Sequence, residues 1–233
     1  MKIDILTIFP KMFEPVLNES IIKRAKAAGR IKINVRDLRD FTLDKHRKVD
    51  DRPFGGGSGM VLTPQPIFDA LNKIKAGVKG RGLKAILLSP QGKQFNQEAA
   101  KRLAKYRHLI FICGHYEGVD ERVREEIDEE ISIGDYILTG GELAAMVVLD
   151  SIVRLIPGVL GDKNSLNFES FEGNLLEYPQ YTRPANFRGL KVPEVLLCGD
   201  HKKIEAWRRA QALERTKQRR PDLFKLAKIR REK

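Results

Sequence analysis

Apolar and polar positions near the start of the chain follow two patterns, one typical of strands and one typical of helices. Lys2–Phe9 is an apolar, β-branched run closed by Pro10, and Ile31–Val35 alternates with period two. Between them, Asn18–Ala28 repeats apolar side chains at helical spacing and ends at Gly29, a residue suited to a helix C-cap. The pattern therefore predicts a strand, a helix and a second strand.

The same alternation continues to about residue 160. Thr63 followed by Pro64 marks a helix start, with Ile67, Leu71 and Ile74 on one face. Three short apolar runs bounded by turn residues suit buried strands: Leu83–Leu88, Leu109–Cys113 and Ile131–Gly134. Two further segments read as helices: Asn96–Tyr106, with Ala99 and Leu103 facing inward, and Glu142–Leu155. Alternating strands and helices favour an α/β domain with a mostly parallel sheet.

The remainder of the chain has a different pattern. A polar stretch, Gly161–Asn167, has the composition of an exposed linker. Asp200 can cap a helix that runs to Leu213, and Pro221 can open another. We expect a domain over residues 1–160, a flexible linker over 161–175 and a small helical domain over 176–233.

Charge separates the two expected domains. The 233 residues contain 43 Lys+Arg and 31 Asp+Glu, a net charge of +12. Residues 176–233 alone hold 16 Lys+Arg and 7 Asp+Glu, so nine of the twelve net charges lie there. A basic module beside a nearly neutral domain indicates nucleic-acid binding; a solvated, basic helix face is the alternative.

Several classes of protein are disfavoured. The two cysteines, Cys113 and Cys198, cannot form a disulfide framework, and the four histidines show no metal-ligand spacing. The longest apolar run, Leu143–Leu149, is far too short for a membrane span, and the N-terminus does not resemble a signal peptide. We expect a soluble protein of a reducing compartment, without a bound metal.

Glycine-rich segments follow the predicted strands where an α/β sheet binds ligands. They are Ser89–Gly92, Cys113–Gly118 and Gly134–Glu142. Each alone could be an ordinary turn, but the three together predict one pocket for a small cofactor. A further segment, Arg47–Met60, places glycines beside cations, and it is either a clamp on a nucleic-acid backbone or a disordered surface loop. No phosphate-binding glycine motif is present.

These segments carry a resemblance to a known family. The motifs are Ser89-Pro90-Gln91-Gly92, Cys113-Gly114-x-Tyr116-Glu117-Gly118-Val119-Asp120-Glu121-Arg122, Ser132–Glu142, Arg52–Gly57, Pro157–Gly161 and Leu176–Pro184. Together they resemble the signature of the bacterial tRNA (guanine-N1)-methyltransferases, the TrmD family, from the N-terminus to about Asp222.

The resemblance implies a fold and an activity. Family members are SPOUT methyltransferases: α/β proteins with a parallel sheet, helices on both faces and a deep trefoil knot, followed by a small helical C-terminal domain. They are homodimers with the active site at the subunit interface. They transfer a methyl group from S-adenosyl-L-methionine to N1 of guanosine 37 in tRNA, where guanosine 36 precedes it. The resemblance also implies a cytoplasmic enzyme.

Motif matching also implies a set of cofactor-binding residues. They are Pro90, Gly114, Tyr116, Glu117, Gly118, Ile133, Gly134, Asp135, Tyr136, Ile137, Leu138, Gly140 and Gly141. His115 stands where several relatives have Arg.

The resemblance implies two catalytic residues. The family's general base is an Asp just before Ser-Phe, and Glu169 stands at that position here. Arg154 matches the cation that stabilises charge on guanine O6. We expect the linker to become ordered only when cofactor and tRNA are bound, over the partner subunit's pocket.

Two other classes of function remain open at this point. A non-catalytic RNA-binding protein would explain the basic C-terminal module but not the three glycine-rich segments. A SPOUT methyltransferase with another RNA target would share the pocket but lack the linker and C-terminal motifs.

Overall fold

A computed structural model describes residues 1–77, 82–161 and 169–229. The chain divides into two compact units, Met1–Gly161 and Asp162–Lys233. Residues 162–168 of the expected linker lie outside the described residues. The prediction that the linker becomes ordered when cofactor and tRNA bind concerns these same residues.

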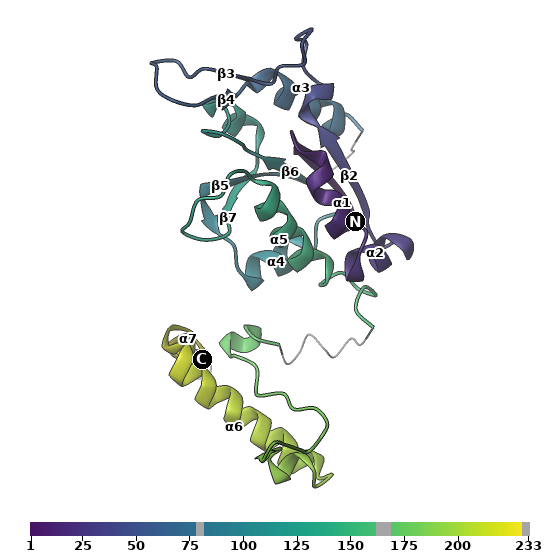
Figure 1. The fold of residues 1–233 in the computed structure, drawn as a ribbon, viewed down its shortest axis with the longest axis vertical. Helices are drawn as coiled ribbons and strands as arrows, with labels where there is room; N and C mark the ends of the chain where they lie inside the picture. Colours follow the sequence, from purple (N-terminus) through teal and green to yellow (C-terminus); the bar gives the residue numbers. More distant parts are fainter. Residues whose placement is uncertain (78–81, 162–168, 230–233) are drawn as a thin grey trace. The chain divides into compact units, whose positions relative to one another are not determined.

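The first unit is built on a parallel sheet (Figure 1). Its five strands run in the order β2-β1-β6-β5-β7, and all neighbours are parallel. They are β1 (Lys2–Thr7), β2 (Lys32–Asp37), β5 (Leu83–Gln94), β6 (His108–Cys113) and β7 (Glu129–Ser132). A separate antiparallel pair consists of β3 (Asp50–Asp51) and β4 (Val61–Leu62).

Helices cover the sheet on both faces, as the family resemblance implied. They are α1 (Glu14–Leu17), α2 (Ser20–Ala27), α3 (Pro64–Lys75), α4 (Gln97–Leu103) and α5 (Glu142–Val153). One apolar cluster joins the sheet to α2, α4 and α5, and the other joins it to α3. Alternation along β1 explains the division, since Ile5 lies in the first cluster and Leu6 in the second. The parallel α/β prediction is confirmed.

The helix expected after Thr63 agrees closely with the structure. Helix α3 begins at Pro64, and Ile67, Leu71 and Ile74 are all buried. Pro64 fits the first turn because its missing N–H would have no partner inside the helix. Similarly, α2 stops just before Gly29, whose φ of +67° favours glycine.

The strand bounds differ from prediction, most of all in β5. Strand β5 does not end at Leu88 but continues to Gln94, and its pairing with β7 shifts register between Leu88 and Lys93. Strand β7 begins at Glu129, two residues before the predicted start. Charged residues are uncommon in strands, but Lys84 Nζ lies 3.0 Å from the Glu129 carboxylate and compensates its charge.

Other local features also escaped the sequence pattern. Helix α4 runs from Gln97 to Leu103, and its fully buried alanine is Ala100 rather than Ala99. Short 3₁₀ helices occur throughout the described chain. They are Pro10–Phe13, Leu38–Asp40, Glu121–Glu126, Glu172–Asn174 and Glu194–Leu196.

The second unit contains two helices and a hairpin. Helix α6 (His201–Arg219) is capped by Asp200, whose side chain accepts hydrogen bonds from two backbone N–H groups, and α7 (Pro221–Ile229) follows. Strands β8 (Asn186–Phe187) and β9 (Leu190–Lys191) enclose a turn in which both central residues have positive φ. That geometry matches the twist of a two-residue hairpin.

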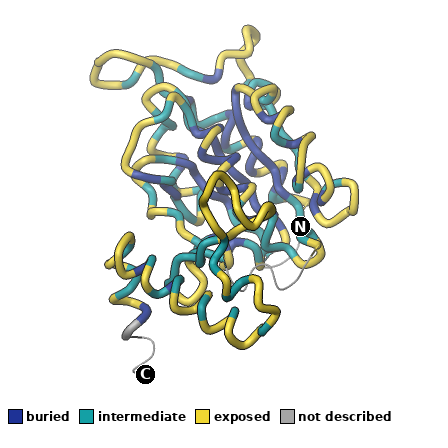
Figure 2. Tube along the Cα trace, turned by 60° about the horizontal axis from the view of Figure 1, so that its bottom comes forward, coloured by how far each residue is buried: buried dark blue, intermediate teal, exposed yellow. Residues whose placement is uncertain are grey.

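Burial is uneven along the chain (Figure 2). Buried residues concentrate in the strands and helices of the first unit, whereas residues 181–191 are all exposed. Among the described residues, no helix is both long and apolar enough to cross a membrane.

A buried carboxylate, Asp4, connects strands β1, β2 and β6. It accepts hydrogen bonds from Arg36 Nε at 2.6 Å and Asn34 Nδ2 at 3.1 Å, and His108 Nε2 lies 2.7 Å away. Burial alone would raise the pKa of Asp4, but these hydrogen bonds outweigh it and hold the pKa below its usual value.

We therefore expect protonation of Asp4 to account for part of the stability that the fold loses in acid. With its pKa lowered by folding, ionised Asp4 stabilises the fold above the unfolded pKa of about 4, and this contribution is lost as the pH falls through the folded pKa. When urea unfolding is measured at pH 6 and at pH 3, the free energy of unfolding should fall less between the two for Asp4→Asn than for the wild type. At pH 6 the variant should be about 1–3 kcal/mol less stable. Equal losses in acid would contradict the role of Asp4.

Candidate functional site

A pocket of about 380 Å³ lies at the carboxyl ends of β6 and β7, beside the irregular part of β5. The three glycine-rich segments named above converge on it. Its lining comprises Leu87–Gln91, Gly114–Val119, Glu121, Arg124, Ile131–Gly134, Tyr136–Gly141 and Ala144. This is the edge at which parallel α/β sheets bind ligands.

Backbone hydrogen bonds hold two of these segments together. The N–H of Gly141 donates to the carbonyl oxygen of Gly114 at 2.8 Å, and His115 and Gly140 form an isolated antiparallel bridge. Within the first segment, the N–H of Gly118 donates to the carbonyl oxygen of His115 at 3.0 Å. The pocket wall is therefore made largely of fixed backbone.

Glycine is required where these segments pack closely. A Cβ on Gly141 would lie 2.8 Å from Cys113 Cα and 3.0 Å from the nitrogen of Gly114. Gly134 has a φ of +151°, and a Cβ there would lie 2.5 Å from the Tyr136 ring. A side chain at either position would displace the pocket wall.

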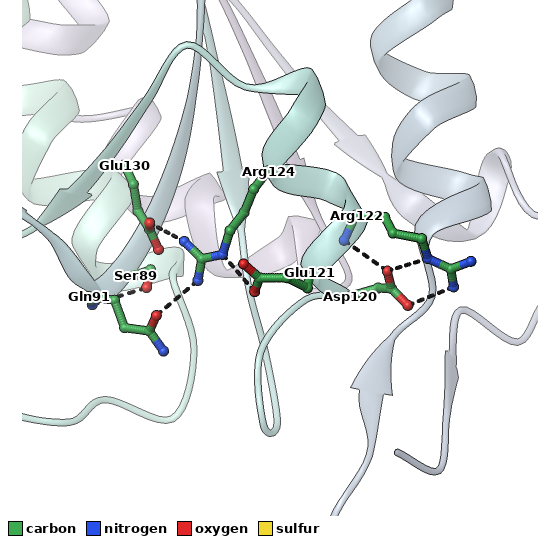
Figure 3. A network of polar contacts seen from close by, with 7 residues as sticks. All are labelled: Ser89, Gln91, Asp120, Glu121, Arg122, Arg124 and Glu130. Carbon is green, nitrogen blue, oxygen red and sulfur yellow. Dashed lines mark hydrogen bonds and ion pairs between the residues drawn. The ribbon is translucent and has the colours of Figure 1, made fainter. Parts of the chain in front are cut away.

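An ion-pair network borders the pocket at Arg124 (Figure 3). Its guanidinium donates to Glu121 at 2.8 Å, to the Gln91 side chain at 3.1 Å and to Glu130. The hydrogen bond with Glu121 has the largest effect on the pKa of Arg124, and together with the bond to Glu130 it raises this pKa above its usual value. The network connects the irregular part of β5 to the 3₁₀ helix Glu121–Glu126 and to β7, and so fixes one side of the pocket.

Most of the predicted cofactor residues meet in this pocket. Those that line it are Pro90, Gly114, Tyr116, Glu117, Gly118, Ile133, Gly134, Tyr136, Ile137, Leu138, Gly140 and Gly141. Asp135 is exposed and is not among the lining residues.

The prediction did not include every residue that lines the pocket. Gln91, Glu121 and Thr139 stand inside or beside the quoted motifs, so their position could have indicated them. Arg124 and Ala144 could not be found in this way. Arg124 is held at the pocket by its ion pair with Glu130, and Ala144 lies in the first turn of α5.

Polar groups beneath the pocket form a second cluster. Thr7 Oγ1 donates to the buried carboxylate of Glu142 at 2.7 Å, and His115 Nδ1 lies 3.9 Å from the same carboxylate. Burial, and then the charge of Glu142, raise the pKa of the Cys113 thiol well above its usual range. Cys113 is therefore a neutral, packed side chain and not a nucleophile.

The glycine-rich segment between β3 and β4 is attached to the same pocket. The N–H of Glu117 donates to the Met60 carbonyl at 3.0 Å, and Leu62 and Val119 form a parallel bridge. Gly59 has a φ of +85°, a backbone conformation that favours glycine, and a Cβ there would lie 2.2 Å from the Glu117 carboxylate. This connection could not be predicted, because it depends on the tertiary position of β4.

The two residues expected to be catalytic belong to different units. Arg154 is half-buried at the C-cap of α5 in the first unit. Glu169 belongs to the second unit, where it lines a hollow of about 390 Å³ together with Glu172, Glu177, Glu205 and residues of α6.

Cations on α6 extend along much of its surface. Lys202, Lys203, Arg209, Lys217 and Arg219 are exposed, whereas Arg220 forms an ion pair with Asp222 at 2.6 Å. Among the described residues, no group of three or more His, Cys, Asp or Glu side chains is placed to hold a metal ion.

Known proteins are similar to this chain over nearly its whole length. The sequence model of the tRNA (guanine-1)-methyltransferase family, TrmD, matches residues 1–226. A tRNA (guanine-N(1)-)-methyltransferase of Anoxybacillus flavithermus is 59% identical over 225 residues, covering 96% of this chain and 91% of that protein. One from Carboxydothermus hydrogenoformans is 60% identical over 227 residues, covering 97% and 88%. A third, from Limosilactobacillus reuteri, is 57% identical over 234 residues, covering 100% and 93%. These matches confirm the resemblance carried by the motifs.

Proposed function

This chain belongs to the TrmD family of tRNA (guanine-1)-methyltransferases, and from that premise we propose that it transfers a methyl group from S-adenosyl-L-methionine to N1 of guanosine 37 in tRNA. The observation that carries the proposal is the convergence of three glycine-rich segments on one pocket at the carboxyl edge of the sheet.

The pocket residues fit S-adenosyl-L-methionine. The pocket volume of about 380 Å³ is in the range of small-molecule sites, and Ile133 and Leu138 offer apolar contact to a base. The glycines at 140 and 141 let the segments of the pocket wall pack closely, because a Cβ at either position would meet atoms of neighbouring residues. Glu117 and Glu121 supply carboxylates suited to a cation. When bound, the sulfonium provides an electrophilic methyl group and leaves as a neutral thioether.

The chain's own residues would carry out the proton transfer. Guanine N1 holds a proton and is a poor nucleophile until that proton is removed. We assign its removal to the carboxylate of Glu169, which accepts the proton as N1 forms its bond to the methyl carbon. Arg154 would stabilise the negative charge that develops on O6, because a guanidinium stays charged and donates several hydrogen bonds.

The basic second unit would hold the tRNA. Its exposed cations on α6 suit phosphate contacts, which position a nucleic acid without reading its sequence. From family membership we also propose a homodimer with the active site at the subunit interface, a deep trefoil knot in residues 1–160, and a cytoplasmic location.

A methyl-transfer assay with tRNA transcripts tests this function. With radiolabelled S-adenosyl-L-methionine, a transcript with guanosine at 36 and 37 should be methylated, and one with adenosine at 37 should not. Methylation of both at equal rates would indicate another target position. Absence of transfer together with retained tRNA binding would indicate a non-catalytic RNA-binding protein.

We expect Gly141→Ala to weaken binding of S-adenosyl-L-methionine. The new Cβ would press against backbone atoms of Cys113 and Gly114, which cannot move as a flexible side chain can. Overpacking of this kind corresponds to a loss in affinity of about 5- to 100-fold, measurable by titration calorimetry. The matched control is Gly77→Ala, whose Cβ would meet only the Ile74 carbonyl oxygen, at 3.8 Å. Equal affinities in the two variants would refute the close packing.

A further inference from the structure

The second unit contains another hollow, of about 570 Å³, distinct in character from the one that Glu169 lines. It lies between the segment 178–185, the 3₁₀ helix Glu194–Leu196 and α6. We call it the Tyr–Arg hollow. The side chains that give it its character are Tyr178, Tyr181, Arg183, Leu196, Ile204 and Arg208.

Two hydrogen bonds hold the wall of this hollow, one at each end. The N–H of Leu176 donates to Thr216 Oγ1 on α6 at 2.8 Å, just before the segment begins. At its other end the N–H of Val192 donates to the Ala185 carbonyl oxygen at 2.9 Å. The hollow is therefore a built feature of the unit and not the gap beside a loose loop.

Charge distinguishes the two hollows of the unit. None of the described residues that line the Tyr–Arg hollow carries a carboxylate, whereas Arg183 and Arg208 contribute two guanidinium groups. The neighbouring hollow shares Arg208 but is lined by four carboxylates: Glu169, Glu172, Glu177 and Glu205. An anionic ligand would be repelled from the neighbouring hollow and attracted to the Tyr–Arg hollow.

The aromatic rings suit a flat ligand. The guanidinium carbon of Arg208 lies 4.8 Å from the centroid of the Tyr178 ring, so the two side chains form a cation–π interaction. The Tyr181 ring lies 6.4 Å from the Trp207 ring at an angle of 49°, and Tyr181 is still 49% exposed. Its ring therefore retains a surface on which another ring can stack.

We propose that the Tyr–Arg hollow binds one unpaired nucleotide of the RNA substrate, with its base against Tyr181 and its phosphate beside Arg183 and Arg208. The proposal rests on the proposed function for the identity of the RNA. Bases in single-stranded loops can stack on aromatic side chains, whereas bases inside a duplex are already stacked. The volume of about 570 Å³ is in the range of sites that enclose small ligands.

The test uses the full chain and an RNA hairpin with the fluorescent base 2-aminopurine in its loop. Wild type and Tyr181→Phe should quench the fluorescence on binding, because both retain a ring. Tyr181→Leu should lose the quenching and bind the hairpin about tenfold more weakly. Phe187→Leu is the matched control, since Phe187 is an exposed aromatic residue of the same unit that does not line the hollow.

A second variant and one competing probe make the test decisive. Arg183→Gln alters an exposed side chain, so it should fold normally and still weaken hairpin binding, whereas Lys191→Gln should not. Quenching that is unchanged in Tyr181→Leu, or equal for a label in the stem, would overturn the proposal. Displacement of the hairpin from the hollow by a glutamate-rich peptide would show an acidic-peptide site instead.

The two proposals can fail separately. If tRNA is methylated at guanosine 37 but no Tyr181-dependent quenching occurs, only the nucleotide site is wrong. If quenching depends on Tyr181 but no methyl transfer is detected, the nucleotide site stands and the proposed function is wrong.

Discussion

Replacing Glu169 by Gln should lower the rate of methyl transfer at saturating substrates by about a hundred- to ten-thousand-fold, the usual contribution of a general base. The amide keeps the size of the side chain but cannot accept the N1 proton. Binding of S-adenosyl-L-methionine should be nearly unchanged, because Glu169 is not among the residues that line the cofactor pocket. Single-turnover assays with radiolabelled cofactor, alongside calorimetry, measure the two effects.

Two further variants separate chemistry from structure at this position. Glu169→Asp keeps the carboxylate and places the family's residue there, so it should retain most of the activity. Glu172→Gln removes another carboxylate of the same hollow and should leave turnover within about twofold of wild type. Equal losses of turnover and cofactor affinity in Glu169→Gln would show that Glu169 is not the base.

Reversing charge on α6 should produce the second large effect. Arg209, Lys217 and Arg219 are exposed, and changing all three to Glu should weaken tRNA binding by at least tenfold at low salt. The slope of log affinity against log salt should become shallower by about one for each phosphate that the variant no longer binds. Filter binding across a salt series measures both quantities.

The choice of these three positions follows from the structure. Arg208 and Arg220 are also basic residues of this region, but Arg208 contacts the Tyr178 ring and Arg220 pairs with Asp222, so reversal there would disturb the fold as well. The control is a triple reversal at Lys23, Arg24 and Lys105, exposed cations of the first unit. If both triple variants lose affinity and salt dependence equally, the second unit has no special role in holding tRNA.

The fold was predictable where one local rule decided the structure. The spacing of Ile67, Leu71 and Ile74 predicts α3 because the three side chains lie on one helical face, and all are buried. The early start of β7 was not predictable, since Glu129 is tolerated in a strand only because Lys84 and Arg102 reach it from other elements. Such compensation is a tertiary effect and leaves no local pattern.

The candidate site was predictable to a similar extent. Glycines after strands indicated a pocket, and motif resemblance selected residues such as Tyr116 and Leu138, which do line it. Nothing in the spacing placed Arg124 beside Gln91, because that contact depends on the register shift in β5 and on the position of Glu130. The Tyr–Arg hollow was also invisible, since its two arginines come from elements separated along the chain.

The pairing of β3 with β4 sets a limit on how far the glycine-rich segment between them can travel. Both ends of Arg52–Met60 are fixed by that ladder, so the tip can extend by only about half the contour length, roughly 15 Å. Phe54, which is 99% exposed, is carried on this tether, and β4 is joined to Val119 in the pocket wall. Any molecule that Phe54 touches must therefore come within that distance of the β3–β4 ladder, whose strand β4 is itself bridged to the pocket wall.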